Sequence, residues 1–318
     1  MELSVTLFVI GAILLLVSTQ AFIKLAERIS ASLKLSPLII GLTVVSIGTS
    51  LPELTVSSIA ALRGDIGLAM GNLIGSNIVN VFLVLGTGIL VGKLRVGTIK
   101  TQVGTIKTQR NIYIMSGITG LFLLMYAFGI VNIIAGSILL VIALIVTFDE
   151  YVWGVRGRTR EDVKMYAKRK YNRFSVFDIG KLCVSLAGLV IGGILTVSSV
   201  EKLSVLLGFS TTILGLSITA IVTSFPELLT TIFSEKDHQE KITIGNLIGS
   251  NIYNLALIGG IVLLFSSWKP ITSYEVLMLI TATLAFTIIV VGNKGKVIPN
   301  YVGYVLITLF GAYIYFLR

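Results

Sequence analysis

Two short motifs carry the residues with the clearest chemical potential. Residues 48–53 read GTSLPE and residues 222–227 read VTSFPE, and each motif lies inside an apolar run long enough to cross a membrane. Each motif ends in a glutamate, Glu53 or Glu227, and a carboxylate at such depth costs about 2.5–3.5 kcal/mol on insertion scales. These runs carry no Lys or Arg at comparable depth that could pair with the acids. The two carboxylates therefore predict a shared site for a positively charged ligand.

Further oxygen donors accompany these acids. Proline has no N–H, so Pro52 and Pro226 leave the carbonyl groups of Gly48 and Val222 without their helical donors. A cation can satisfy such a carbonyl where lipid cannot, and the preceding half-helix presents its negative C-terminal end at the same place. Hydroxyl and amide oxygens come from the motifs and from residues 71–80 and 245–254, namely Thr49, Ser50, Ser76, Asn77, Asn80, Thr223, Ser224, Ser250, Asn251 and Asn254.

The nature of these candidate ligands restricts the cation. Every one is a hard oxygen, which favours Ca²⁺ and Na⁺ over softer transition metals. The sequence has one cysteine, Cys183, and one histidine, His238, which falls in a polar loop. Glu53 and Glu227 together supply two negative charges, enough to neutralise one Ca²⁺.

Small and amide residues of the same segments suggest structural roles beside the site. Asn72 and Asn246 are expected to cap or brace helices. Glycines spaced four residues apart allow two helices to approach closely, and they occur here at Gly71, Gly75, Gly245 and Gly249.

The two motifs belong to an internal repeat. An offset of 174 residues, which takes Thr49 to Thr223, aligns residues 36–80 with residues 210–254 without a gap. The identities gather in two blocks, at the motifs themselves and at residues 71–78 and 245–252. Repeats of inverted topology are the plan of many secondary transporters, which place the substrate at the repeat interface near the membrane midplane.

The composition predicts an all-α polytopic membrane protein. Of the 318 residues 55% are hydrophobic and only 13% are charged, about half the charged fraction of a soluble domain. Apolar runs predict ten transmembrane helices, arranged as two inverted five-helix repeats. The predicted spans are residues 5–25, 36–62, 67–92, 112–128, 130–148, 179–200, 211–233, 242–266, 274–291 and 298–316.

The charge distribution predicts the orientation of the chain. The net charge of +10 arises mainly from loops, so the basic residues are expected to set membrane topology and not to bind nucleic acid. Residues 1–148 form the first predicted repeat, residues 149–178 a basic cytoplasmic linker and residues 179–318 the second repeat. The loop 93–110, which contains a perfect tandem heptapeptide over residues 96–109, is placed in the cytoplasm as well. Both termini then face the outside of the cell membrane.

At these motifs the sequence resembles the calcium/cation antiporter superfamily, in particular the archaeal and bacterial sodium/calcium exchangers. Their two repeats are similar to GTSLPE at residues 48–53 followed by GNLIGS at residues 71–76, and the second copies lie at residues 222–227 and 245–250. The resemblance covers both repeats and implies a central cluster occupied alternately by three Na⁺ or one Ca²⁺. It also implies that the first and sixth spans slide as a gate. The ligand positions that it implies are Thr49, Ser50, Glu53, Ser76, Asn80, Thr223, Ser224, Glu227, Ser250 and Asn254, with the backbone carbonyls of Ser46 and Ala220.

The sequence also departs from this family. Sodium/calcium exchangers usually carry an aspartate at one of the positions held here by Asn80 and Asn254, so the usual stoichiometry does not transfer directly. Val222 replaces the second motif glycine, and Phe225 replaces its leucine.

The expected function is exchange of Ca²⁺ for Na⁺ by alternating access, by a monomer that needs no cofactor. Exchange of Ca²⁺ for H⁺ or another monovalent cation at the same site is the nearest alternative, and a cation channel is a more remote one. An intramembrane hydrolase would need a nucleophile with a base or a metal held by histidine, so we expect no enzymatic activity.

Overall fold

The computed structural model describes residues 2–32, 46–92, 94, 102–156, 176–236, 240–265, 273–293 and 296–317. Every secondary-structure element in these ranges is a helix, which confirms the all-helical prediction. Three of the elements are π-helical turns, labelled η. The first part of the chain forms α1 (Glu2–Ser32), α3 (Ser46–Thr49), α4 (Leu51–Leu62), α5 (Ile66–Val79), η2 (Asn80–Leu85), α6 (Gly86–Val91), α7 (Gln102–Ala127) and α8 (Ile133–Arg156).

The second part repeats this order of long and interrupted helices. Its elements are α10 (Val176–Leu207), α11 (Thr211–Leu214), η3 (Gly215–Thr219), α12 (Ala220–Thr223), α13 (Phe225–Lys236), α14 (Glu240–Tyr253), η4 (Asn254–Ile258), α15 (Gly259–Phe265), α16 (Ser273–Gly292) and α17 (Asn300–Tyr315).

Seven helical stretches in the described residues are long and apolar enough to cross a membrane. Two shorter apolar helices, Leu51–Leu62 and Asn300–Tyr315, fall at predicted spans two and ten. The prediction of ten spans therefore remains a prediction, and the start of the second span, residues 36–45, lies outside the described residues.

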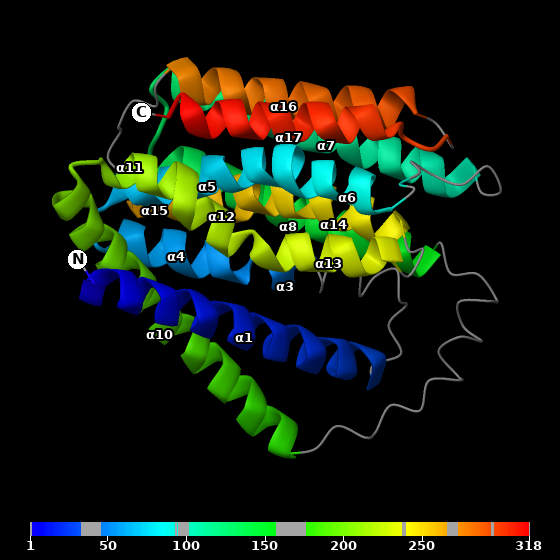
Figure 1. Cartoon of the computed structure of the whole chain (residues 1–318). Coiled ribbons are helices and arrows are strands. Elements are labelled where there is room, and N and C mark those ends of the chain that lie inside the picture. The colour runs from blue at the N-terminus through cyan, green and yellow to red at the C-terminus, as the bar shows by residue number, and fades with distance from the viewer. Residues whose placement is uncertain are drawn as a thin grey trace.

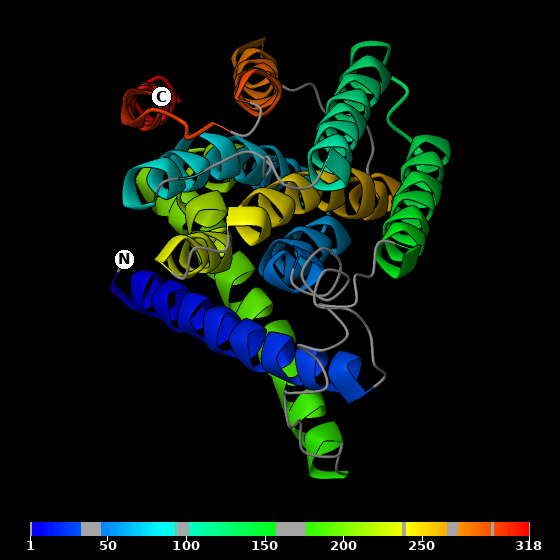
Figure 2. The ribbon, with the colours of Figure 1, turned by 90° about the vertical axis from the view of Figure 1, so that its right-hand side faces the viewer.

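The helices form layers around a central group of interrupted helices (Figures 1 and 2). The segments α4, α5, α13 and α14, with their neighbouring short pieces, occupy the middle. The helices α7, α16 and α17 cover one side of this group, α8 lies at its flank next to α7, and α1 and α10 cross the group on the other side, packed against each other. The run from α3 to α4 and the run from α11 to α13 point in opposite directions, and both chain termini lie at the same end of the bundle (Figure 1).

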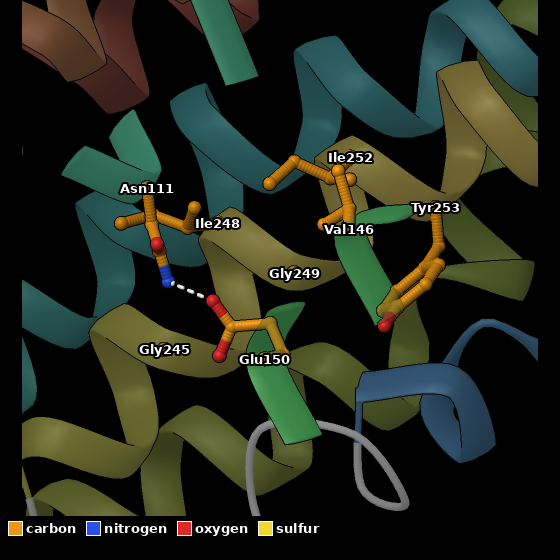
Figure 3. A pocket seen from close by; sticks show the side chains of 8 residues that line it. All are labelled: Asn111, Val146, Glu150, Gly245, Ile248, Gly249, Ile252 and Tyr253. Atoms are coloured by element: carbon orange, nitrogen blue, oxygen red, sulfur yellow. Dashed lines mark hydrogen bonds between the residues drawn. The ribbon is translucent and has the colours of Figure 1, made fainter. Parts of the chain in front are cut away.

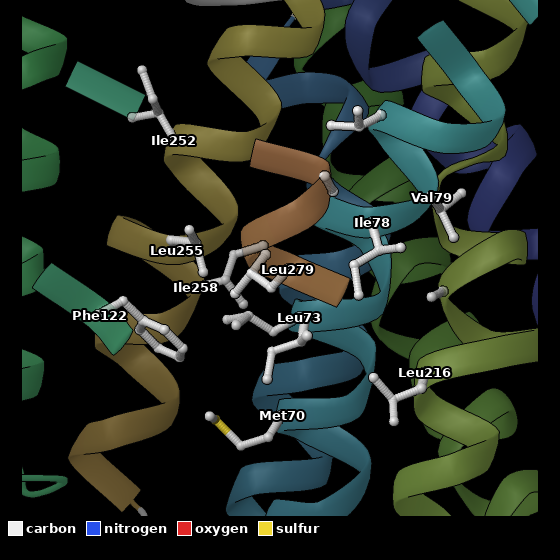
Figure 4. Close-up of a cluster of buried hydrophobic side chains, with 14 of the residues drawn as sticks. Met70, Leu73, Ile78, Val79, Phe122, Leu216, Ile252, Leu255, Ile258 and Leu279 are labelled. Carbon is white, nitrogen blue, oxygen red and sulfur yellow. The ribbon is translucent and has the colours of Figure 1, made fainter. Parts of the chain in front are cut away.

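Apolar side chains fill the space between the central group and its outer cover. Met70 and Leu73 of α5 lie toward Leu255 and Ile258 of η4 in this cluster, which also includes Ile78 (Figure 4). Phe122 reaches it from α7 and Leu279 from α16, and both side chains are buried. Because this packing joins both parts of the chain, the interrupted helices are held in fixed positions relative to one another.

Glycines bring two central segments into backbone contact. A Cβ atom added to Gly71 would lie 2.5 Å from the Thr212 carbonyl oxygen, and one added to Gly75 would lie 2.7 Å from the Leu216 carbonyl oxygen. The contact is mutual, because a Cβ atom on Gly215 of η3 would lie 2.8 Å from the carbonyl oxygen of Leu68 in α5. The close approach predicted for Gly71 and Gly75 is therefore confirmed, and it places α5 directly against η3.

Two helices extend into segments that were predicted as loops. The loop 93–110 is shorter than predicted, because α7 begins at Gln102 and includes the second heptapeptide copy, residues 103–109. Similarly, α8 continues past residue 148 to Arg156, so part of the predicted linker is helical, while residues 157–175 lie outside the described residues. An ion pair joins α7 to α8 here: a guanidinium nitrogen of Arg110 lies 2.7 Å from a carboxylate oxygen of Asp149. Hydropathy locates the apolar section of a helix, and both helices extend beyond it with polar residues.

Substitution of Gly75 tests the backbone contact. We expect Gly75→Ala to lower the free energy of unfolding by about 1–3 kcal/mol, because the new methyl group would overlap the Leu216 carbonyl. Thermal unfolding of the purified protein in detergent measures this loss. Gly120→Ala in α7 is the matched control, since nothing lies within 4 Å of its added Cβ atom. Equal stability of the two variants would contradict the contact.

Candidate functional site

Two helix interruptions position the predicted acids. The α-helical hydrogen-bonding pattern breaks at Ser50, with φ −84° and ψ 8°, and at Ser224, with φ −81° and ψ 8°. Each proline then lies in the first turn of the next helix, where proline is common because the first amides of a helix have no partner within that helix. Glu53 and Glu227 follow in the first turns of α4 and α13, at the positive ends of these helices. The predicted interruptions are confirmed, and both glutamate side chains are fully buried.

The two acids are tied together by hydroxyl groups that cross between the repeats. Ser224 donates to Glu53 Oε1 at 3.0 Å, and Ser50 donates to Glu227 Oε1 at 3.3 Å. Ser250 donates to the same Glu227 oxygen at 3.2 Å. Each carboxylate therefore depends on a serine from the opposite half of the chain, so the two motifs form one site.

The threonines of the motifs extend this crossed pattern. The Thr49 hydroxyl lies 3.4 Å from the Ser250 hydroxyl, and the Thr223 hydroxyl lies 3.4 Å from the Ser76 hydroxyl. Each threonine also contacts the carbonyl oxygen of the residue three positions earlier, Ser46 or Ala220, at 3.3 Å. The two carbonyl groups implied by the family resemblance are thus adjacent to the hydroxyl cluster.

Asn72 and Asn246 brace the site. The Thr223 hydroxyl donates to Asn72 Oδ1 at 3.1 Å, and Asn72 Nδ2 donates to the Ser57 hydroxyl at 3.0 Å. The Thr49 hydroxyl lies 3.2 Å from Asn246 Oδ1. The prediction that these amides brace helices is confirmed, since each joins one repeat to the motif of the other.

The remaining predicted amides lie at the starts of two π-helical turns. Asn80 begins η2 and Asn254 begins η4, and both side chains are fully buried. Asn80 Nδ2 donates to Asn251 Oδ1 at 3.1 Å, whereas Asn77 bonds the Leu73 carbonyl of its own helix. The structure therefore places Asn80 and Asn251 across from each other, and it does not bring the Asn77 amide nitrogen to the acids.

Several buried oxygens of this cluster have unused acceptor capacity. Among the described residues, no hydrogen-bond partner is found for Glu53 Oε2, Glu227 Oε2, Asn80 Oδ1, Asn254 Oδ1 and the Ser46 hydroxyl. Buried polar atoms are normally satisfied, because an unpaired one costs about 1–3 kcal/mol. The oxygens gathered here belong to carboxylate, amide, hydroxyl and carbonyl groups. A hard cation is the ligand that such oxygens bind.

A second polar cluster, which the sequence did not predict, joins α7 to α8 beside α14 (Figure 3). Asn111 donates to Glu150 Oε1 at 2.6 Å, and Arg110 reaches the same oxygen at 3.3 Å. Glu150 is buried although it was assigned to the linker. The helix extension of α8 places it there, and the only signal in the sequence was the pairing of opposite charges at residues 110 and 149–150. A small pocket in this region is lined by Asn111, Val146, Glu150, Gly245, Ile248, Gly249, Ile252 and Tyr253.

Known proteins resemble this chain over its whole length. The sequence profile of the sodium/calcium exchanger protein family matches residues 3–150 and 178–318. An uncharacterised membrane protein of Methanocaldococcus jannaschii is 30% identical over 93% of this chain and 92% of its own length. The sodium/calcium exchanger MaX1 of Methanosarcina acetivorans is 29% identical over 97% of this chain and 96% of its own length.

The fold agrees with these sequence matches. The solved structure of the sodium-calcium exchanger NCX_Mj, soaked with Na⁺ and Sr²⁺, superimposes with a TM-score of 0.66 at 28% identity, covering 100% of this chain and 99% of that one. The chain therefore belongs to the sodium/calcium exchanger protein family, a family of membrane cation antiporters.

Proposed function

We propose that this protein exchanges Ca²⁺ for Na⁺ by alternating access at the site formed by Glu53 and Glu227. The observation that carries the proposal is the crossed pair of buried carboxylates. Each accepts a hydrogen bond from a serine of the other repeat, and each keeps its second oxygen without a partner in the described structure. Such a pair is costly to bury unless a cation neutralises it.

The proposed ligands are those predicted from the sequence. Glu53 and Glu227 supply the charge, and the carbonyl groups of Ser46 and Ala220 supply two further oxygens. The other ligands are the side chains of Thr49, Ser50, Ser76, Asn80, Thr223, Ser224, Ser250 and Asn254. Flexible sets of six to eight oxygens suit Ca²⁺, and the same oxygens suit Na⁺. Because both cations require the same two charges, binding of one excludes the other.

Charge neutralisation is the proposed basis of coupling. Two bare carboxylates cannot move past an apolar barrier without a large cost, so the protein changes access only when a cation occupies the site. The empty transporter is then confined to one side, and net leak is suppressed. A sodium gradient can drive Ca²⁺ transport because only the cation-loaded states cross.

The proposed architecture is ten spans in two inverted repeats, residues 1–148 and 179–318, joined by the linker 149–178. The opposite directions of α3–α4 and α11–α13, and the termini at one end of the bundle, support it (Figure 1). The linker is proposed to be cytoplasmic and both termini external, with the chain acting as a monomer in the cell membrane. The helices α1 and α10 are proposed as the moving pair.

Small residues at the α1–α10 contact support a moving pair. A Cβ atom on Gly11 would lie 2.8 Å from the Thr196 hydroxyl, and one on Gly192 would lie 2.9 Å from the Leu15 amide. The two helices therefore touch along their backbones and can move as a unit. Both also contact α4, which carries Glu53.

Neutral substitution of either acid tests the proposed site. We expect Glu53→Gln and Glu227→Gln each to lower Ca²⁺ uptake into proteoliposomes at least about 100-fold, because each removes half of the charge that holds the ion. Glu2→Gln, on an exposed glutamate of α1, is the control and should leave uptake unchanged. Thermal unfolding confirms that the variants fold. Normal uptake by either folded variant would refute the site.

The driving gradient distinguishes the counter-ion. Vesicles containing the protein are loaded with Na⁺, K⁺ or acid, and Ca²⁺ uptake is followed in a medium without the loaded ion. We expect uptake to follow only the outward Na⁺ gradient. Uptake driven by the proton gradient alone would show that H⁺, and not Na⁺, is the counter-ion bound by the same carboxylates. Uptake without any opposing gradient, at rates far above those of carriers, would indicate a channel.

A further inference from the structure

A residue outside the predicted site contacts the backbone of a site-forming helix. Tyr313 of α17 is fully buried, and its hydroxyl donates to the Leu216 carbonyl oxygen at 2.7 Å. Leu216 belongs to η3, the π-helical turn that leads into α12. Because α17 belongs to the outer layer, this bond connects the cover of the molecule to its centre.

The Leu216 carbonyl lies where the helical pattern changes. In an α-helix the Ala220 amide would donate to the carbonyl four residues earlier, which is that of Leu216. The Ala220 amide instead donates to the carbonyl groups of Gly215 and Ser217. The π-helical turn therefore moves the Ala220 amide away from the Leu216 carbonyl, and the Tyr313 hydroxyl donates to that carbonyl from outside the helix.

The opposite side of the turn is closed by α5. A Cβ atom on Gly75 would lie 2.7 Å from the Leu216 carbonyl oxygen and 2.8 Å from the Ala220 Cβ. No side chain at position 75 could reach this carbonyl without displacing the turn. The turn is thus clamped between a glycine backbone and a tyrosine hydroxyl, with little freedom to relax.

Tyr313 is itself held in place. Its ring stacks on that of Tyr274 of α16, with centroids 6.4 Å apart and an interplanar angle of 10°. The Tyr274 hydroxyl donates to the Tyr313 carbonyl oxygen at 3.0 Å. The same α17 helix packs against η2, the turn that begins at Asn80, so it contacts two of the turns that adjoin the site.

We propose that Tyr313 is a positioning residue for cation binding, which fixes the π-helical turn Gly215–Thr219 and, through it, the Ala220 carbonyl and the Thr223–Ser224 hydroxyls. This inference rests on the proposed function, because it assigns the effect to ligands of that site. The bond fixes the ligands before the cation arrives, so the binding energy is not consumed in ordering the turn. Tyr313 touches no transported ion and acts only through the backbone of η3.

Removal of the single hydroxyl group tests this role. In Tyr313→Phe, the Ca²⁺ concentration for half-maximal uptake should rise about 10-fold, equivalent to about 1.4 kcal/mol, while the maximal rate stays within about 2-fold. The Ca²⁺-induced rise in unfolding temperature of the purified protein should shift to higher Ca²⁺ concentration by the same factor. Tyr304→Phe, on the exposed side of the same helix, is the matched control and should change neither value.

The outcomes separate this proposal from the proposed function. Wild-type protein that neither transports Ca²⁺ nor gains stability from it would refute the function itself. If the wild type does both, an unchanged half-saturating concentration in Tyr313→Phe overturns the positioning role. A lower unfolding temperature without Ca²⁺, combined with unchanged half-saturation, would make Tyr313 a purely structural residue and would overturn it as well.

Discussion

The burial of two carboxylates in the apolar centre of the molecule is the constraint on which the rest of the structure depends. Glu53 and Glu227 are fully buried, and each receives a hydroxyl from the opposite half of the chain. These hydroxyl bonds, one to Glu53 and two to Glu227, do not compensate for the lost hydration of two charges. The positive ends of α4 and α13 and the proposed cation share that task.

The interrupted helices bring backbone and side-chain oxygens together at one place. A continuous α-helix uses its carbonyl groups internally, whereas breaks at Ser50 and Ser224 and π-helical turns at Asn80, Gly215 and Asn254 change the local pattern. Such irregular backbone is tolerated at membrane depth only where protein surrounds it. The glycine contacts between α5 and η3, and the Tyr313 hydroxyl, provide that surrounding support.

Much of the site was predictable because its signals are local and repeated. A glutamate after a proline in an apolar run, found twice at one offset, indicated both the breaks and the pairing, and the crossed serine bonds agree with it. The buried amides that brace the motifs were predicted for the same reason. The polar extensions of α7 and α8 were missed, because hydropathy does not report helicity, and Glu150 was therefore assigned to a linker. Tyr313 could not be found, since its contact with Leu216 spans nearly a hundred residues and depends on how α17 packs.

Location of the bound ion tests the central claim most directly. Crystals of the protein grown without Ca²⁺ can be soaked with Ca²⁺ or Sr²⁺, and the ion can be placed by its anomalous scattering. We predict a peak between Glu53 and Glu227, within coordination distance of an oxygen of each, which weakens as Na⁺ in the soak increases. A divalent cation bound elsewhere, with no peak shared by the two carboxylates, would contradict the account.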